Sequence, residues 1–430
     1  MNLKTATRIV QRDGAPQTQR LQADICVVGA GISGISAAVE AARLGRKVVL
    51  VDGLPALGGQ AVNSLIGTFC GLFSNGPDPY QFTHGIADDI LRDLAAREAL
   101  NYRWGGDWTT VMYDEVALSR WVEDAVYREG VTVILGGVLR RAGRDGRRIT
   151  ELDIATRYGD VTIEAEGFID ATGDAALAWL AGLPCREPED GPVYGTQMLV
   201  LEGVNEDHHP PREAMTARLG EKGREYGMVR VDGFSFLFSG RGIALINMTH
   251  VETPLEPVAA SARALEGKAQ TDKVVDFLKA EYPAAFGDAR VRAYGFPGIR
   301  QTRWIVGAHH LTVDEVRAGK KFDDAVARCA WAIELHDKPD SIVWESFAHD
   351  HVHYVPLGCL TPPDADNLLA VGRCIDADVS ALSSVRVMGP CIATGAAAAH
   401  ALDLAGSGSV HQIDRAALRE RLYDNVDRTD

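Results

Sequence analysis

Two short segments in the second half of the chain carry side chains suited to anion binding and proton transfer. Arg300 and Arg303 stand three residues apart in "GIRQTR", so a helix would place both on one face. A guanidinium binds carboxylates through paired hydrogen bonds, although a structural ion pair is an equally frequent use of such a residue. His336 lies beside Asp337 in "IELHD", and histidine suits proton transfer near neutral pH. Arg300 and His336 are therefore catalytic candidates, with an ordinary core histidine as the commoner alternative.

A third segment, "FAHDHVHYVPLGC", contains three histidines at alternate positions. A strand would place His349, His351 and His353 on one face. Such a face could bind a metal, but no cysteine or acid is placed to complete a ligand set. We therefore predict no metal site and a polar active-site wall instead, with His353 and Tyr354 as further catalytic candidates.

The start of the chain predicts the scaffold that would position these side chains. Residues 25–28 are an apolar run typical of a buried strand, and "GAGISG" at 29–34 matches G-x-G-x-x-G. Residues 35–44 favour a helix, and residues 47–51 form a second apolar strand that ends at Asp52. This order of elements, with an acid at the second strand's end, is typical of a dinucleotide-binding fold.

Each residue type in this loop has a physical reason. Gly29 permits a tight turn, Gly31 lets a pyrophosphate approach the backbone, and Gly34 lets the helix pack closely on the sheet. The helix start attracts phosphates, and Asp52 can accept hydrogen bonds from ribose hydroxyls. The expected cofactor contacts from this region are Gly29, Gly31, Ile32, Ser33, Gly34, Asp52 and Gly53.

Three further glycine turns lie far apart along the chain. "LGGQ" (57–60) follows the second strand, "ATGD" (171–174) ends a third strand, and Gly372-Arg373 follows a much later one. A ligand that touches the first loop and these distant turns must be long, and FAD meets that requirement. A closing helix that begins near Met388 could direct its positive end at a flavin ring. These segments add the expected contacts Gly58, Gly59, Gln60, Ala171, Thr172, Gly173, Asp174, Gly372, Arg373, Met388 and Cys391, with helix capping as an alternative role for Asp174.

These motifs resemble the FAD-dependent oxidoreductase family of the glutathione-reductase-type flavoprotein superfamily, which is related to fumarate reductase flavoproteins and thiazole synthases. The resemblance rests on "ICVVGAGISGISAAVEAARLG", "LGGQ", "IDATGDAALAWLAG", "GIRQTRWIVG", "IELHD" and "NLLAVGRCIDADVSALSSVRVMGPCIATGAAAA". It covers both ends of the chain well and the middle poorly. It implies tightly bound FAD and a redox role, without fixing the substrate.

Departures from related patterns refine this expectation. The disulfide reductases of the superfamily carry a C-x-x-x-x-C pair after the glycine-rich region, where this chain has only Cys70, and no histidine stands there for a covalent flavin link. We therefore expect non-covalent FAD, with Cys70 either a buried structural thiol or a thioether link. Where relatives have an arginine, Leu357 follows "YVP", which predicts a less anionic substrate. Gly240-Arg241-Gly242 lacks a third glycine, so no separate nicotinamide domain is expected.

The fold class predicted is α/β: a Rossmann-like FAD-binding domain, built of a parallel sheet with helices and a β-hairpin, with an inserted mixed α+β substrate domain. The expected division is 1–186 for the first part of the FAD-binding domain, 187–293 for the insertion, and 294–430 for the return and closing helix. The 430 residues, 46% of them hydrophobic, are sufficient for this arrangement. The polar first twenty residues favour a short leading strand and a solvated turn.

Composition limits the partners and the setting. The net charge of -15 argues against nucleic-acid binding, and no apolar run reaches membrane-spanning length. Seven scattered cysteines and the lack of an apolar signal region predict a reducing, cytoplasmic setting. We expect hydride transfer between a small organic substrate and FAD, with oxygen or a separate electron carrier as a further partner. An oxygen-using monooxygenase or oxidase, and a flavoprotein with a non-redox use of FAD, stay open, as does a homo-oligomer.

Overall fold

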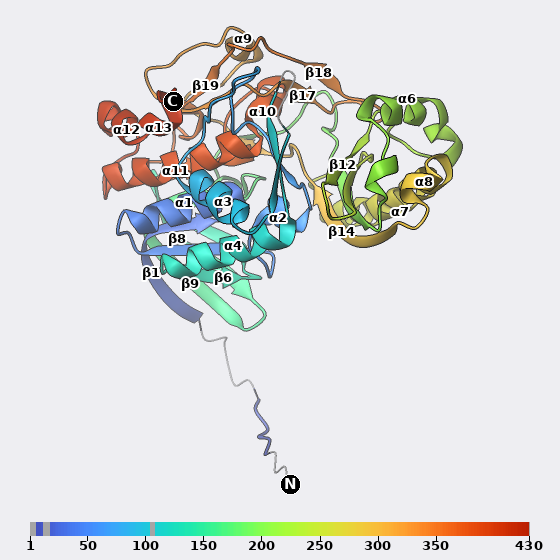
Figure 1. Cartoon of the computed structure of the whole chain (residues 1–430). Coiled ribbons are helices and arrows are strands. Elements are labelled where there is room, and N and C mark those ends of the chain that lie inside the picture. Colours follow the sequence, from blue (N-terminus) through green and yellow to red (C-terminus); the bar gives the residue numbers. More distant parts are fainter. Residues whose placement is uncertain (1–5, 12–17, 104–107, 430) are drawn as a thin grey trace.

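The computed structural model describes residues 6–11, 18–103 and 108–429. Residues 6–11 have no regular structure, and the first strand begins at Thr18, earlier than the predicted residue 25. The predicted leading strand and turn fall partly on segments outside the described residues. Two lobes are visible, a larger one that contains both ends of the folded chain and a smaller one formed by its middle (Figure 1).

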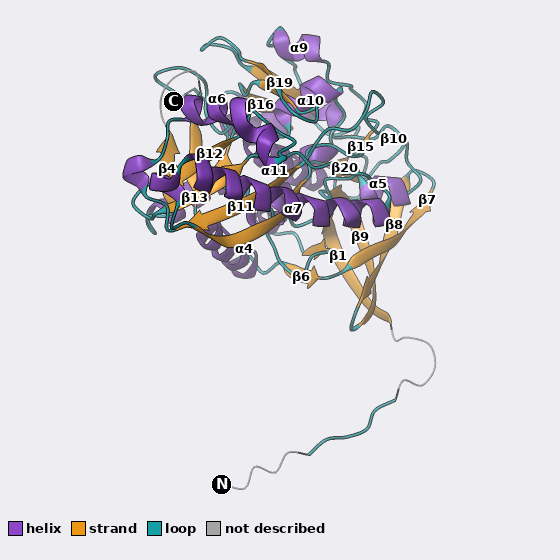
Figure 2. Cartoon of the chain, turned by 90° about the vertical axis from the view of Figure 1, so that its right-hand side faces the viewer, coloured by secondary structure: helices purple, strands orange, loops and turns teal. Residues whose placement is uncertain are grey.

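A seven-stranded sheet forms the centre of the larger lobe (Figure 2). The order is β6-β2-β1-β9-β8-β7, and β20 also pairs with β9. β6, β2, β1, β9 and β20 are parallel, whereas β7 and β8 form an antiparallel hairpin that continues onto β9. The predicted parallel sheet and hairpin are confirmed. The bounds are β1 (Thr18–Val28), β2 (Val48–Asp52), β6 (Thr132–Leu135), β7 (Val138–Asp145), β8 (Arg148–Thr156), β9 (Gly159–Asp170) and β20 (Leu368–Ala370).

The register of this sheet brings the predicted glycine turns together. Val28 at the end of β1 pairs with Val51 of β2 and with Asp170 of β9, and Ala370 of β20 also pairs with Asp170. The carboxyl ends of these parallel strands therefore meet at one edge of the sheet, where ligands bind in open α/β folds. Turns that are far apart in the sequence become neighbours by this pairing alone.

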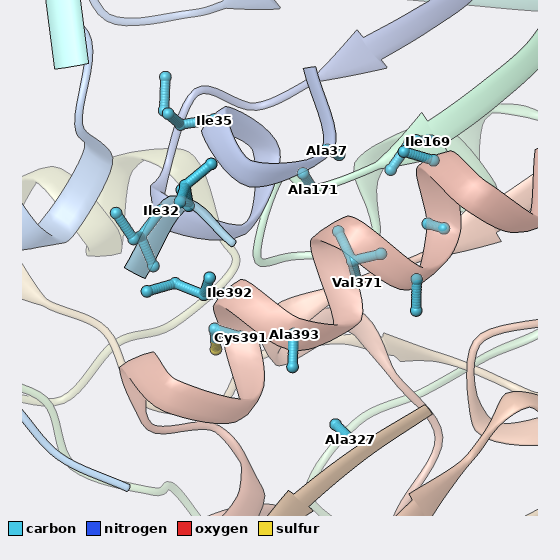
Figure 3. Packing of buried hydrophobic residues seen from close by; sticks show 14 of the residues in the cluster. Ile32, Ile35, Ala37, Ile169, Ala171, Ala327, Val371, Cys391, Ile392 and Ala393 are labelled. Carbon is cyan, nitrogen blue, oxygen red and sulfur yellow. The ribbon is translucent and has the colours of Figure 1, made fainter. Parts of the chain in front are cut away.

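Two helices join the two ends of the chain at this edge. α1 (Ile32–Arg43) follows β1, and α11 (Met388–Ala405) lies against it, with Ile392 near the start of α1 (Figure 3). Gly395 permits the contact, because a Cβ there would lie 2.2 Å from a backbone oxygen of α1. Ser36 Oγ donates to the Ile392 carbonyl at 2.8 Å. The closing helix is thus confirmed, and it begins at the predicted position.

The smaller lobe is a four-stranded antiparallel sheet with its own apolar core. Its strand order is β12-β13-β11-β14, and helices from the same part of the chain surround it (Figure 1). The two strands predicted from "FSFLF" and "IALIN" are β12 and β13. The bounds are β11 (Thr196–Glu202), α6 (Arg212–Lys222), β12 (Phe234–Phe238), β13 (Ile243–Asn247), α7 (Pro257–Glu281), α8 (Pro283–Phe286) and β14 (Arg290–Gly298).

Shorter elements connect and cover the two sheets. In the first half these are α2 (Gly59–Asn63), β3 (Thr68–Phe69), α3 (Ile86–Ala95), β4 (Leu100–Arg103), β5 (Thr110–Tyr113), α4 (Glu115–Arg128), α5 (Ala176–Leu180) and β10 (Cys185–Arg186). In the second half they are β15 (Trp304–Ile305), α9 (Val313–Arg317), β16 (Ala325–Cys329), β17 (Ile333–Leu335), β18 (Val343–Glu345), β19 (His353–Pro356), α10 (Val379–Val385), α12 (Arg415–Arg421) and α13 (Tyr423–Val426).

Two local predictions are wrong. The "GIRQTR" segment is not helical, because β14 ends at Gly298 and β15 begins at Trp304, which leaves too few residues for a helix. The three alternate histidines do not share a strand face either, because β19 begins only at His353 and His351 lies in the preceding loop.

Within the part of the chain that the structure describes, no single helix is both long and apolar enough to cross a membrane. α10 and α11 reach that length and composition only when taken together, and they meet at an angle of 89°.

Candidate active site

A cavity of about 1050 Å³ lies at the convergent strand ends, and both lobes line it. Its size is at the upper end for ligand sites, so it can accommodate a long cofactor together with a small molecule. Most of the predicted cofactor residues border it. They are Gly29, Gly31, Ile32, Ser33, Asp52, Gly59, Gln60, Ala171, Thr172, Gly173, Asp174, Arg373, Met388 and Cys391.

The other four predicted contacts, Gly34, Gly53, Gly58 and Gly372, are not on the cavity wall. A Cβ on Gly34 would lie 1.8 Å from the Gly29 carbonyl oxygen, so Gly34 is required for packing. Gly372 has φ +65°, and a Cβ there would lie 2.7 Å from Ser33 Oγ. Three of the four keep the walls close together or turn the chain, and nothing in the structure gives Gly53 a comparable role.

The residues at the glycine-rich loop fit a dinucleotide. A Cβ on Gly31 would meet no atom within 4 Å, so open space lies directly against this backbone. No side chain caps α1, which leaves its first N–H groups for a ligand's phosphates. Among the described residues, none gives a hydrogen-bond partner to the buried Nη1 of Arg373, which also lines the cavity. FAD would be held by Gly29, Gly31 and the start of α1 at its pyrophosphate.

Asp52 borders the cavity with both carboxylate oxygens already in use. Oδ2 accepts from the Ala30 amide at 2.5 Å, and Oδ1 accepts from the Leu54 amide at 2.7 Å. Burial raises the pKa of Asp52, and the two amide bonds partly offset that rise. Each carboxylate oxygen can accept more than one hydrogen bond, so contact with ribose hydroxyls stays a prediction.

Asp174 does not cap a helix, contrary to the alternative role considered for it. α5 begins at Ala176 after Ala175 adopts a left-handed conformation with φ +48°. The Ala176 amide donates to Thr172 Oγ1 at 3.0 Å, so Thr172 provides the cap. Asp174 instead accepts a hydrogen bond of 2.5 Å from Thr302 Oγ1, and its carboxylate borders the cavity.

The part of the cavity beyond Met388 is lined by aromatic rings and arginines. Arg103 lies over the Phe236 ring at 5.0 Å, and Arg212 lies over the Phe234 ring at 3.9 Å. These rings come from β12 of the smaller lobe. The other lining residues of these types are Trp108, Phe296, Arg300, Trp331, Trp344 and Arg386. This composition favours a planar or aromatic molecule that carries a negative charge.

Of the predicted catalytic residues, only Arg300 borders the cavity. Its side chain is buried, and its Nη1 donates to the Tyr194 carbonyl at 2.7 Å. Burial, reinforced by the charge of Arg386, lowers the pKa of Arg300. The "GIRQTR" partner, Arg303, instead pairs with Glu187 and lies over the Trp179 ring.

His336 is fully buried behind the wall and reaches the cavity through a residue that the sequence interpretation missed. Its Nε2 lies 3.0 Å from Glu334 Oε1, and Glu334 borders the cavity. Trp331 Nε1 donates to the other carboxyl oxygen of Glu334 at 3.1 Å, and Arg386 Nη2 donates to the Glu334 carbonyl at 2.9 Å. The signal for Glu334 was its place two residues before His336 in "IELHD".

His353 and Tyr354 lie away from the cavity. His353 is buried and contacts His351 at 3.1 Å and Ser384 at 3.0 Å, and burial lowers its pKa to about 3. Tyr354 packs half-buried against the main core. The expected polar wall from this segment is therefore wrong. Leu357 does not border the cavity either, which removes the basis for predicting a less anionic substrate.

Cys70 borders the cavity as a half-buried thiol. Burial, reinforced by the charge of Glu334, raises its pKa to about 12. A thiol in this state is a poor nucleophile, which agrees with the expectation of non-covalent FAD. Within the described residues there is also no group of histidines, cysteines and acids that could hold a metal ion.

The comparisons with known proteins agree on the class. The sequence matches the family model described as FAD dependent oxidoreductase over residues 24–422, so the chain belongs to that family. "Probable oxidoreductase OrdL" of Haemophilus influenzae is 40% identical over 72 residues, a match that spans 15% of this chain and 15% of that protein. The protein is thus an FAD-dependent oxidoreductase with a Rossmann-like fold.

Solved structures with a similar fold include two flavoprotein relatives. A geranylgeranyl bacteriochlorophyll reductase-like protein from Thermoplasma acidophilum is 13% identical, with a TM-score of 0.46 over 94% of this chain and 80% of that one. A triple mutant of the flavin-dependent brominase Bmp2 is 11% identical, with a TM-score of 0.49 over 94% of this chain and 84% of that one. These likenesses do not specify the reaction of this chain.

Proposed function

We propose that the protein is a dehydrogenase or reductase that moves a hydride between a small organic acid and non-covalently bound FAD. The observation that supports this proposal is a single cavity with two unlike parts. One part has the glycine turns and the helix start that a dinucleotide needs. The other part has rings and guanidinium groups that suit a planar anion.

The arginines would bind and orient the acid. Arg386 lies in the cavity wall next to Met388, and its pKa is lowered by burial. Among the described residues, none provides a partner for its buried Nε, so a substrate carboxylate can accept from it. Arg212 and Arg103 would hold the same molecule from the side of the smaller lobe. When bound, FAD supplies the redox chemistry by accepting or donating a hydride.

The proposal is tested by anaerobic titration of the FAD-loaded protein with small aromatic acids and with their methyl esters. We expect an acid to bleach the visible absorption of oxidised flavin, and the matching uncharged ester to have little effect. Bleaching by none of the acids would overturn the proposal. A reaction that proceeds only when oxygen is admitted would favour the alternative of a monooxygenase or oxidase.

Arginine variants test the orientation. Arg386→Gln should weaken the apparent affinity for the acid by about 10- to 150-fold, which corresponds to the loss of one charged hydrogen bond of roughly 1.5–3 kcal/mol. Arg147→Gln is the matched control, because Arg147 pairs with Asp366 on the surface. Equal affinities for the two variants would contradict the role of Arg386.

A further inference from the structure

A row of three side chains runs from the cavity wall into the interior. Glu334 borders the cavity, and its Oε1 lies 3.0 Å from Nε2 of the fully buried His336. Nδ1 of His336 lies 2.8 Å from Nε2 of His250, which is also buried. The row ends where Nδ1 of His250 lies 3.1 Å from the carbonyl oxygen of Pro339. Each contact is within hydrogen-bond distance.

The carbonyl at the end of the row fixes the direction of every hydrogen bond. A carbonyl oxygen can only accept, so Nδ1 of His250 must carry a hydrogen. In a neutral ring Nε2 of His250 then accepts, which requires a hydrogen on Nδ1 of His336. By the same step Nε2 of His336 accepts, so Glu334 Oε1 must be the donor. Oε2 already accepts from the Trp331 indole, which leaves Oε1 as the oxygen that bears the proton.

The surroundings keep both imidazoles neutral. Burial lowers the pKa of His336 well below its ordinary value, and the charges of Arg300, Arg230 and Arg386 add to this effect. Burial and the same type of cationic neighbours also lower the pKa of His250. The nearest acid beyond Glu334 is engaged elsewhere, because Asp232 pairs with Arg230 at 2.6 Å. The face of His250 is covered by the stacked Tyr194 ring at 5.6 Å, which is not a charged group.

An ionised Glu334 would break this row. With a carboxylate and two neutral imidazoles, at least one contact would bring two lone pairs together in a buried position. An unsatisfied buried group of this kind costs about 1–3 kcal/mol. Protonation of Glu334 removes the conflict and satisfies all three contacts at once.

We propose that Glu334 carries a proton at neutral pH and donates it to the substrate, and that His336 and His250 are positioning residues that keep the proton on it. This inference rests on the proposed function for its substrate, but not for the protonation of the row. No annotation of the family and no sequence motif used above assigns this role to Glu334 or His250.

The step balances as a two-electron reduction. The hydride, which is one proton with two electrons, passes from the reduced cofactor to one atom of a substrate double bond. The second proton passes from Glu334 to the adjacent atom, which breaks the Oε1–H bond and leaves a carboxylate. A half-turn about the terminal side-chain torsion of Glu334, which is a soft one, turns the protonated oxygen from His336 towards the cavity. The reverse reaction returns the proton to the same carboxylate.

The protonation of the row is tested first without any substrate. In the FAD-loaded protein labelled with ¹⁵N-histidine, NMR at neutral pH should show the hydrogen of His250 and of His336 on Nδ1. Resonances are assigned with His250→Gln and His336→Gln. A hydrogen on Nε2 of either ring would overturn the proposal. Infrared spectra should also show a carboxylic-acid band that Glu334→Gln removes and that Asp337→Asn, at the exposed neighbouring acid, leaves in place. Absence of this band in the wild type would overturn it as well.

Kinetics then test the donor role. Glu334→Gln keeps a donor towards His336 but has no proton to give, so flavin should bind normally while turnover falls by roughly 10²–10⁴-fold. His250→Phe frees His336 to donate to a carboxylate, so activity should be lost at a lower pH than in the wild type. His209→Phe, at another partly buried histidine outside the row, is the matched control. Wild-type rates in Glu334→Gln, or an unmoved pH profile in His250→Phe, would overturn the proposal. If no substrate reduces the wild-type flavin, the proposed function fails, while the NMR result still decides the state of the row.

Discussion

Replacing Gly31 with alanine separates cofactor binding from folding. Gly31 has φ -70°, a conformation that alanine adopts readily, and a Cβ there would meet no protein atom within 4 Å. The apoprotein should therefore tolerate the change. FAD should not, because the new methyl group would occupy the space in which we place the pyrophosphate.

The magnitudes follow from this geometry. In the apoprotein, the gain of about 0.4–1 kcal/mol from a less flexible unfolded chain is offset by about 0.5–1 kcal/mol from a poorer residue at a helix N-cap. The net change in unfolding free energy should be within about 1 kcal/mol. Crowding of the ligand by one methyl group costs about 1–3 kcal/mol, which weakens FAD binding by roughly 5- to 150-fold.

The assay compares Gly31→Ala with Gly34→Ala. Thermal unfolding of the apoproteins and FAD titration by fluorescence quenching give the two quantities separately. A Cβ on Gly34 would lie 1.8 Å from the Gly29 carbonyl oxygen, so Gly34→Ala should lose about 3 kcal/mol or more of stability. If Gly31→Ala binds FAD as tightly as the wild type, the pyrophosphate is not at this loop and the reasoning is refuted.

Three further predictions concern the thiols, the cofactor link and acid stability. Burial raises the pKa of Cys70 and Cys391 to about 12, so about one thiol in ten thousand is ionised at about pH 8. Iodoacetamide should modify them far more slowly in the native than in the unfolded chain, and rapid labelling by mass spectrometry would contradict this. Acid precipitation should release all FAD into the supernatant, whereas flavin retained on the Cys70 peptide would show a covalent link. Burial alone would raise the pKa of Glu315, but hydrogen bonds from Lys320, a backbone amide and His309 lower it to about 2. A carboxyl with a lowered pKa stabilises the fold above its unfolded pKa of about 4.5. The stability deficit of Glu315→Gln in urea unfolding, about 1 kcal/mol after solvent screening, should therefore shrink as the pH falls towards 2, and a deficit that grows would contradict the assignment.

The cofactor half of the site could be predicted because its signals are local. A strand, a glycine-rich turn and a helix follow one another within residues 25–44, and each has its own pattern of residue types. Asp52 ends the next strand. Parallel pairing then brings the later turns to the same edge, as the register of Val28 with Asp170 shows. Little depends on contacts that a sequence pattern cannot specify.

The substrate half could not be predicted in the same way. Glu334 and Arg212 are far apart in the sequence, and only the packing of the two lobes places both on one cavity. Histidine patterns misled because His351 stacks on Phe347 in a loop, at 4.0 Å between ring centroids, instead of extending a strand. The importance of His250 depends entirely on a contact with His336, which no spacing in the sequence indicates.

A crystal structure of the protein with bound FAD tests the central claim most directly. We predict the adenosine end near Asp52, the pyrophosphate against Gly31 and the start of α1, and the flavin ring between Met388 and Glu334. Density for FAD at another site, or a protein that takes up no FAD when it is supplied, would contradict the claim.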